Sequence, residues 1–478
     1  MTKPLNQLSI VEAASGLRAK DFSVRDLWDA CMAEAVAKNE ELNVFLELFD
    51  ANEEAIAAAQ QRIDTEGEGA PLLCGIPIAM KDNILIEGHV ASAASKMLEN
   101  YTATYDATVT AKLKEAGALF IGRTNMDEFA MGSSTEHSAF GSTRNPLDPT
   151  RVPGGSSGGS SAAVAANMAL AALGTDTGGS IRQPAAHCGL VGFKPTYGAI
   201  SRHGLIALGS SLDQAGPLTH TVEDAKILFD VMKGEDSMDA TTIPADFCAT
   251  KTSAAKKRIG VPYHLLASGV DEDVRARFDE TLEKFKEEGY EICEVQLPTS
   301  PYALPAYYVV MPAEASANLA RFDGIRYGNG GKGKDLLEDY VIAKTEGFGH
   351  ETKRRILLGT FVLSSGYIDA YYRKAQSARG ALIAEYDKAF EEVDVIAFPT
   401  TPSPAFKFGE KSDPVSMYLE DVFTVTANLT GMPAISVPMG MVERDGVQLP
   451  TGIHFTAPKC QDELLFKMGG MVTGEEIY

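Results

Sequence analysis

Two glycine- and serine-rich stretches, residues 153–161 and 174–180, constrain most strongly how this chain can fold. The first reads Pro-Gly-Gly-Ser-Ser-Gly-Gly-Ser-Ser and leads into an apolar segment that predicts a helix over residues 160–173. A run of this composition is usually a flexible linker. Here it lies inside structured sequence, where clustered glycines indicate a backbone at positive φ or close to a ligand. We therefore expect both stretches to belong to a functional site.

Short apolar runs and helical patterns alternate around these stretches, from about residue 71 to residue 234. The pattern predicts strands over residues 76–79 and 118–121, with a helix over residues 107–115 between them. Such alternation is typical of a sheet whose strands are joined by covering helices. The predicted fold class is α/β, with a single large domain and a central mixed, largely parallel sheet covered by helices.

The flanking regions are predicted to be richer in helix. Residues 1–65 form an N-terminal helical region in which Ser23 and Asp26 have the spacing of a capping box. Residues 66–478 form the α/β domain, with a helix-rich insertion over about 265–390. The whole chain is expected to be one compact unit. The remaining predicted elements are a helix over 53–63, a strand over 258–261, helices over 271–288 and 367–391, and strands over 393–398 and 434–439 that rejoin the sheet.

The charge balance restricts the possible partners. The 478 residues include 43 Lys and Arg against 65 Asp and Glu, a formal net charge of −22. A bulk surface of this charge is unsuited to gripping a phosphate backbone. The chain shows neither a signal-peptide pattern nor an apolar run long enough for a bilayer, so we expect a cytoplasmic protein. The six cysteines are scattered and are expected to be reduced: Cys31, Cys74, Cys188, Cys248, Cys293 and Cys460.

Two motif matches lead to alternative interpretations. Overlapping G-x-S-x-G patterns at 154–158 and 155–159 nominate Ser156 or Ser157 as an α/β-hydrolase nucleophile, with His350 or His454 as its base. Any Gly/Ser-rich run generates this pattern, and Arg151-Val152-Pro153 is a poor strand before it. Residues 328–334 have P-loop spacing, but an Asp follows where a hydroxyl should bind magnesium, so we interpret them as a solvated loop.

A buried lysine is the other candidate base. Lys81 follows the apolar run Ile76-Pro77-Ile78-Ala79-Met80, and burial at the end of a strand lowers a lysine pKa. Moving that pKa from about 10.4 to about 7.5 costs roughly 4 kcal/mol, which a chain tolerates where the neutral amine is needed for catalysis. The simpler alternative is a surface lysine whose ammonium reaches solvent.

Three motifs together resemble the amidase signature family. They are Gly-Ile-Pro-Ile-x-x-Lys-Asp at 75–82, Gly-Gly-Ser-Ser-Gly-Gly-Ser at 154–160 and Gly-Thr-Asp-Thr-Gly-Gly-Ser-Ile-Arg-Gln-Pro-Ala at 174–185. Further stretches at 122–133, 192–198 and 314–328 are similar to the A subunits of tRNA-dependent amidotransferases within that family. The resemblance covers about residues 5–440. Beyond it, His454 stands where the family pattern has Gln.

The resemblance implies a role for particular residues. Ser180 would be the nucleophile, Ser156 the bridging serine behind a cis peptide, and Lys81 the base. Backbone amides of Thr177, Gly178 and Gly179 would form an oxyanion hole. The residues that would bind glutamine are Tyr308, Arg355 and Asp421, with Tyr307 and Arg354 as neighbouring rivals.

The resemblance also implies partners. The chain would be the glutaminase subunit that supplies ammonia for amidation of Glu-tRNA(Gln) or Asp-tRNA(Asn). A B subunit would hold tRNA, ATP and magnesium, and a small C subunit would brace the pair. No metal or cofactor is expected on this chain. A free-standing amidase acting on small carboxamides through the same residues is the alternative, and a non-catalytic scaffold is the third possibility.

Overall fold

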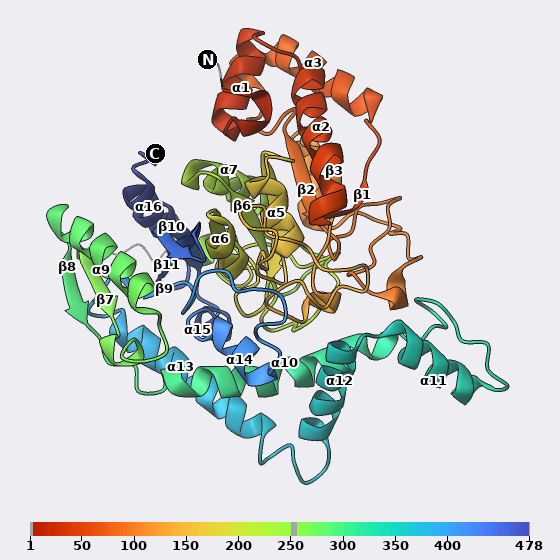
Figure 1. Cartoon of the computed structure of the whole chain (residues 1–478), viewed down its shortest axis with the longest axis vertical. Helices are drawn as coiled ribbons and strands as arrows, with labels where there is room; N and C mark the ends of the chain where they lie inside the picture. Colours follow the sequence, from red (N-terminus) through yellow and green to blue (C-terminus); the bar gives the residue numbers. More distant parts are fainter. Residues whose placement is uncertain (1–2, 250–255, 478) are drawn as a thin grey trace.

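The computed structural model describes residues 3–249 and 256–477, and within them the centre of the molecule is an 11-stranded sheet (Figure 1). The spatial order is β1-β3-β2-β4-β6-β5-β10-β11-β9-β7-β8. The strands are β1 (Phe45–Leu48), β2 (Pro77–Lys81), β3 (Leu119–Thr124), β4 (Ala171–Asp176), β5 (Val191–Lys194), β6 (Gln214–Thr219), β7 (Arg258–Val261), β8 (Glu291–Glu294), β9 (Val395–Pro399), β10 (Ala434–Arg444) and β11 (Val447–Thr456).

The sheet is mixed, as predicted, but it is not largely parallel. Of the ten neighbouring pairs among the described strands, β2 pairs in parallel with β3 and β4, and β7 with β8 and β9, whereas the other six pairs are antiparallel. The long hairpin of β10 and β11 alone imposes one antiparallel pair, because a short turn reverses the chain. Apolar runs predicted the positions of β2, β3, β7, β9 and the start of β10, but not the other described strands, and they carried no information about strand direction.

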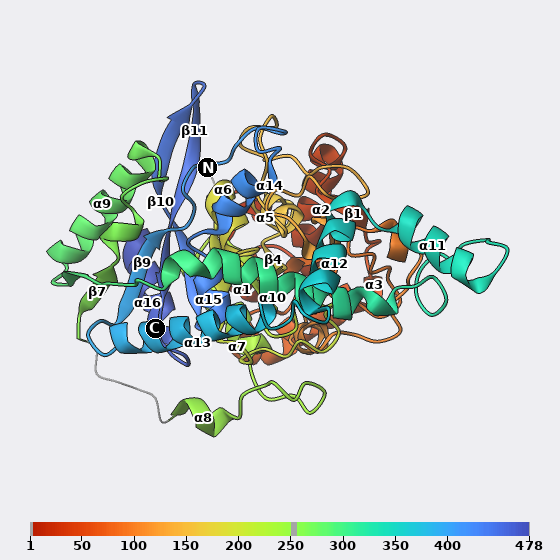
Figure 2. The ribbon, with the colours of Figure 1, turned by 90° about the horizontal axis from the view of Figure 1, so that it is seen from below.

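Helices cover the sheet in layers. Those that pack directly on strands include α5, α6, α7, α9 and α16, whereas α10, α12 and α13 pack on one another in an outer layer around a separate apolar cluster (Figure 2). The helices are α1 (Ile10–Ala19), α2 (Val24–Leu42), α3 (Glu53–Glu66), α4 (Thr108–Glu115), α5 (Gly158–Ala165), α6 (Arg182–Cys188), α7 (Val222–Met232), α8 (Ala245–Ala249), α9 (Glu272–Glu287), α10 (Ala303–Asn318), α11 (Leu336–Gly347), α12 (His350–Leu363), α13 (Tyr372–Ala389), α14 (Pro414–Tyr418), α15 (Val425–Thr430) and α16 (Asp462–Thr473).

The N-terminal region contributes to the sheet as well as to the helical layer. The predicted capping box is present, since the Ser23 hydroxyl accepts from the Asp26 amide and the Asp26 carboxylate accepts from the Ser23 amide. After α2, strand β1 pairs with β3. The first 65 residues are therefore joined to the α/β domain through an edge strand that the sequence patterns did not predict.

The helix predicted over residues 160–173 is shorter in the structure. Helix α5 ends at Ala165, Asn167 adopts φ 57°, and residues Ala171–Asp176 form β4. The alanine-rich sequence favours a helix locally. The second half of this segment forms β4 instead, because it pairs between β2 and β6 in the sheet. This correction matters for function, since β4 delivers the second glycine-rich stretch to the edge where Lys81 lies.

The expectation of six reduced cysteines is wrong for two of them. Cys248 and Cys460 form a disulfide across 212 residues of sequence, with Cα atoms 5.2 Å apart. The other four cysteines are free thiols. Sequence spacing reveals close pairs, not a pair brought together by the fold.

Among the residues that the structure describes, no helix combines the length and the apolar character needed to cross a membrane.

Helices α10 and α12 approach closely at a glycine, which yields a stability prediction. A Cβ added to Gly359 would overlap the Pro312 carbonyl oxygen, whereas one added to Gly380 in α13 would meet nothing within 4 Å. We expect Gly359→Ala to lower the free energy of unfolding by about 1–3 kcal/mol. Gly380→Ala should leave it unchanged or raise it by up to about 1 kcal/mol. Urea unfolding midpoints test both, and equal effects would contradict the close contact.

Candidate active site

Lys81 lies at the end of β2, fully buried among hydroxyl groups. Its Nζ donates to Ser156 Oγ at 2.8 Å, Ser157 Oγ at 2.7 Å and Thr175 Oγ1 at 2.9 Å. The Ser156–Ser157 pair comes from the turn before α5, and Thr175 comes from β4. The parallel pairing of β2 with β4 brings the first and third sequence motifs to the same edge of the sheet. The interpretation of Lys81 as a surface lysine is excluded.

Burial favours the neutral form of the Lys81 amine, the form that a base requires. Desolvation lowers the pKa of Lys81 to about 7, against the opposing attraction of the carboxylates of Asp127, Asp176 and Asp213. Its hydrogen-bond partners are uncharged, so they do not hold the ammonium form as an ion pair would. A large share of Lys81 is therefore neutral near pH 7, as its position in the sequence predicts.

The turn that carries Ser156 leaves no space for a side chain at the preceding position, Gly155. The Gly155–Ser156 peptide is cis, as the resemblance implied, and a Cβ on Gly155 would overlap Asp127 Oδ2. The neighbouring Ser157 amide donates to the Ser180 carbonyl at 3.2 Å. This bond places the two glycine- and serine-rich stretches side by side.

Ser180 follows β4 in a loop held by a buried ion pair. The Arg182 guanidinium binds Asp176 through two bonds, Nε to Oδ2 at 3.0 Å and Nη2 to Oδ1 at 2.8 Å. Asp176 in turn accepts from the amides of Gly179 at 2.9 Å and Ile181 at 3.2 Å, on either side of Ser180. Burial opposes ionisation, but Arg182 holds the pKa of Asp176 well below its usual range. The position of Ser180 is thus fixed by the backbone around it.

The loop of Thr177, Gly178 and Gly179, whose amides are the predicted oxyanion hole, is held by hydrogen bonds to its surroundings. Gly179 adopts φ 141°, a conformation that suits glycine, and its amide is engaged by Asp176. The Gly179 N–H is therefore already used by a hydrogen bond inside the loop. On either side, Thr177 Oγ1 donates to Asp213 at 2.6 Å, and the Gly178 carbonyl accepts from Thr424 Oγ1 at 2.6 Å. These contacts orient the peptide units of Thr177 and Gly178, which stay the candidate donors.

The three residues predicted to bind substrate, Tyr308, Arg355 and Asp421, line one cavity together with Ser180. The Tyr308 hydroxyl donates to Asp421 Oδ2 at 3.3 Å, and the Arg355 guanidinium lies 4.8 Å from the Tyr308 ring centroid. Burial raises the pKa of Asp421 to about 7, although Ser133 donates to it at 2.8 Å. The cavity thus presents a cation and a titratable carboxyl beside the nucleophile.

The structure distinguishes Arg355 and Tyr308 from the alternative candidates Arg354 and Tyr307 only in part. Arg355 is buried and lines both this cavity and an adjacent one, whereas Arg354 is partly exposed, pairs with Glu351 and lines only the adjacent cavity. Tyr307 lines the first cavity together with Tyr308, and its ring packs against Gly178. Arg355 also pairs with Glu351, so its charge is shared before any ligand binds.

Sequence reasoning did not assign the observed contacts of two side chains at this site. Ser157 shares the Lys81 amine with Ser156, and Ser133 anchors Asp421. The serine doublet was a visible signal for the first. Ser133 carried no signal, because it meets Asp421 across 288 residues of sequence.

The α/β-hydrolase interpretation is not supported. Lys81, not a histidine, contacts both Ser156 and Ser157. His454 lies instead behind the loop, where its Nε2 accepts from Arg182 Nη1 at 2.8 Å. Burial and the Arg182 charge hold the pKa of His454 well below its usual range, so the ring is neutral and braces Arg182.

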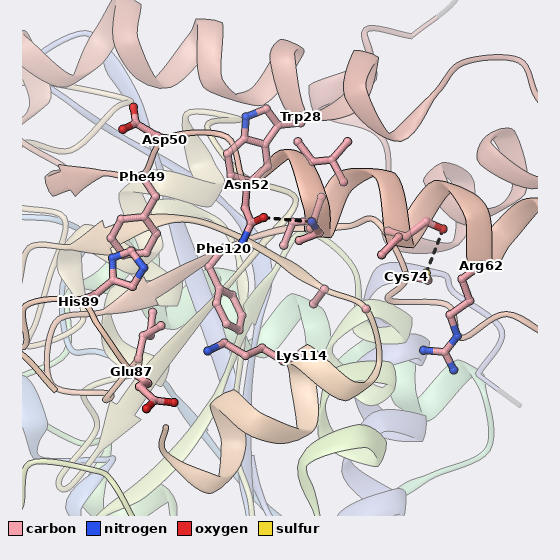
Figure 3. A pocket seen from close by; sticks show the side chains of 18 residues that line it. Trp28, Phe49, Asp50, Asn52, Arg62, Cys74, Glu87, His89, Lys114 and Phe120 are labelled. Carbon is pink, nitrogen blue, oxygen red and sulfur yellow. Dashed lines mark hydrogen bonds between the residues drawn. The ribbon is translucent and has the colours of Figure 1, made fainter. Parts of the chain in front are cut away.

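A larger hollow lies elsewhere and shares no lining residue with the Ser180 cavity. It is bounded by α2, α3 and β3, with Trp28, Phe49 and Phe120 on its walls (Figure 3). The Phe49 ring lies against the His89 ring, with centroids 3.9 Å apart and ring planes tilted by 37°. None of the residues predicted to act in catalysis lines this hollow, so size does not identify the active site here.

Buried Lys81 is hydrogen-bonded to a serine that follows a cis peptide bond, and the hydrogen-bonded loop that carries Ser180 lies beside this pair. This arrangement defines the class of the protein. The model of the amidase family matches residues 26–466, and the chain belongs to this family of enzymes. It is 50% identical to the A subunit of the glutamyl-tRNA(Gln) amidotransferase of Roseiflexus castenholzii, over 98% of this chain and 95% of the relative. The corresponding protein of Koribacter versatilis, which has the same name, is 47% identical over 98% of both chains.

Solved structures agree with this placement. The A subunit of the Thermotoga maritima glutamyl-tRNA(Gln) amidotransferase superposes with a TM-score of 0.81 at 38% identity, covering 100% of this chain and 97% of that one. A peptide amidase from Stenotrophomonas maltophilia also superposes with a TM-score of 0.81, at 27% identity, covering 98% of this chain and 97% of that one. The fold is therefore shared by amidotransferase subunits and by amidases of other kinds.

The pH profile of kcat/KM tests the ionisations of the site. Lys81 must lose a proton to act as a base, and Asp421 must lose one to attract an ammonium. Both groups titrate at about 7. We expect amide hydrolysis to fall as pH decreases below about 7, with a logarithmic slope approaching two. Asp421→Asn should reduce that slope to one, and a flat profile between pH 6 and 8 would contradict the assignment of Lys81.

Proposed function

We propose that this chain is the glutamine-hydrolysing subunit of a tRNA-dependent amidotransferase. The observation that carries the proposal is the Ser180 cavity, where Arg355 and Asp421 offer opposite charges to a free amino acid. A glutamine needs both, because its carboxylate and its ammonium enter the site together. Relatives that are about 50% identical over nearly the whole chain bear the name of such a subunit, which supports the same substrate.

The reaction follows from the contacts of Lys81. Neutral Lys81 accepts the proton of Ser156, and Ser156 accepts the proton of Ser180 as Ser180 Oγ bonds to the side-chain amide carbon of glutamine. Backbone amides of the Thr177–Gly178 loop stabilise the oxyanion. The carbon–nitrogen bond then breaks, and the leaving nitrogen takes a proton back through Ser156 to depart as ammonia. Water hydrolyses the glutamyl ester on Ser180 and releases glutamate.

The second half of the reaction would belong to other subunits. A B subunit would bind the misacylated Glu-tRNA(Gln) or Asp-tRNA(Asn), with ATP and magnesium to activate its carboxyl group, and a C subunit would brace the assembly into a heterotrimer. The net charge of −22 supports this division, because the bulk of this chain would repel tRNA. A cytoplasmic location stays a prediction.

Substitutions of the nucleophile and the base test the reaction. We expect Ser180→Ala to abolish glutamine hydrolysis, because no acyl ester can form. Lys81→Ala should lower kcat by about 10²–10⁴-fold, the usual contribution of a positioned base. Release of glutamate and ammonia by the assembled complex is the measurement, and near-normal turnover of Lys81→Ala would contradict its role as the base.

The neighbouring arginines provide a matched test of substrate recognition. Loss of a charge-assisted bond to the substrate carboxylate costs about 1.5–3 kcal/mol, so Arg355→Gln should raise KM for glutamine by about 10- to 100-fold. Arg354→Gln should change KM by less than about fivefold, because Arg354 lies on the adjacent cavity and is part of a half-exposed pair. The reverse ranking would show that Arg354 binds the carboxylate.

A free-standing amidase is the second candidate, and the superposition with a peptide amidase favours it. The same Lys81, Ser156 and Ser180 would hydrolyse a small carboxamide without partners. The two candidates are separated by assaying the purified chain alone. Rapid hydrolysis of simple amides with no stimulation by other subunits supports the amidase, and glutamine turnover that depends on partners and Glu-tRNA supports the amidotransferase.

A further inference from the structure

The guanidinium of Arg355 is held at one edge and left open at another. Its Nε donates to Glu351 Oε1 at 2.5 Å, one turn earlier on α12. Among the residues that the structure describes, the two terminal nitrogens make a single hydrogen bond, from Nη1 to the sulfur of Met311 at 3.7 Å. A guanidinium can bind a carboxylate through two parallel N–H···O bonds. Because Glu351 occupies Nε, the edge left for a ligand carboxylate is the one that Nη1 and Nη2 form.

Two tyrosine rings restrict the same guanidinium from the side. Its central carbon lies 4.8 Å from the ring centroid of Tyr308 and 4.8 Å from that of Tyr418. The two rings stack on each other, with centroids 3.8 Å apart and planes tilted by 21°. Tyr308 belongs to α10 and Tyr418 ends α14, so side chains from two further helices converge on Arg355. Aromatic faces attract a cation, and together with the bond at Nε they limit its rotation.

Glu351 is a firm support because the helical turn that carries it is itself held. The Glu128 carboxylate accepts from the Gly349 amide at 2.8 Å and from Thr352 Oγ1 at 2.6 Å, which fixes the first turn of α12. Glu351 is buried, and its second oxygen pairs with Arg354. It lines the adjacent cavity and not the cavity of the nucleophile. Its effect on a substrate beside the nucleophile therefore passes through an arginine.

We propose that Glu351 is a positioning residue for the substrate: it holds Arg355 at Nε so that Nη1 and Nη2 together receive the carboxylate of glutamine. This inference rests on the proposed function. The two carboxylates do not compete, because Glu351 and the substrate bind different edges of one guanidinium. Without the bond at Nε, the side chain can turn and offer the substrate a single N–H. Glu351 therefore acts on the binding of glutamine and not on the chemical step at Ser180.

The test is glutamine hydrolysis by the assembled complex, with KM and kcat measured separately. We expect Glu351→Ala to raise KM about tenfold, the cost of one charge-assisted bond to the substrate, and to change kcat less than about threefold. Glu351→Gln keeps an oxygen that accepts from Nε and should leave KM within about threefold of the wild-type value. Glu351→Met fills similar space without that oxygen, so it should act as Glu351→Ala does and replaces it if the alanine variant does not fold.

Two further variants show whether the effect is specific. In an Arg355→Gln background, Glu351→Ala should raise KM no further, because the residue through which it acts is gone. Asp279→Asn is the matched control: Asp279 binds Arg275 Nε at 2.9 Å at the same helical spacing, on α9, which contributes no residue to the Ser180 cavity. It should alter neither constant. Circular dichroism and thermal melting establish that each variant is folded.

The possible outcomes are distinct. A higher KM with kcat retained, restored by Glu351→Gln and absent from the Arg355→Gln background, supports the assignment. If Arg355→Gln raises KM but Glu351→Ala does not, or if Glu351→Ala lowers only kcat, the inference is wrong and the proposed function stands. Equal increases for Glu351→Gln and Glu351→Ala would show that the charge matters and not the bond at Nε, which also overturns it. A wild-type complex that hydrolyses no glutamine overturns the proposed function itself.

Discussion

The site depends on one buried amine held among hydroxyl groups. Lys81 is fully buried, and Ser156, Ser157 and Thr175 accept its hydrogen bonds without neutralising a charge. Desolvation disfavours the ammonium form, while three carboxylates act on it from beyond hydrogen-bond contact. The pKa of about 7 is the balance of these effects. It requires that β2, β4 and the turn before α5 stay closed around the amine.

The loop carrying Ser180 depends on a second buried group of charges. Asp176 holds two backbone amides of the loop, and Arg182 holds Asp176. Removing one charge of a fully buried pair leaves the other uncompensated, which costs about 3–5 kcal/mol. Arg182 is satisfied further by His454 and by the Asn428 side chain. His454 supplies the acceptor through its neutral ring.

Local sequence signals predicted the parts of the molecule that depend on neighbours in the chain. The capping box at Ser23, the strand that ends at Lys81 and the two glycine-rich turns were visible because each is specified within a few residues. Strand direction, the Cys248–Cys460 pair and the contact of Ser133 with Asp421 arise from distant segments and leave no local pattern. The engaged amide of Gly179 was missed for a related reason, since composition does not fix where an N–H points.

Helix α12 carries Arg355 to the Ser180 cavity and reaches the outside of the molecule within a single helical turn. Residues two positions apart on a helix point about 200° from each other, so Arg355 and Leu357 emerge on opposite sides of the same turn. Gly359 fixes the distance between this helix and α10, which carries Tyr307 and Tyr308 to the cavity. A displacement of α12 therefore moves Arg355 relative to both tyrosines.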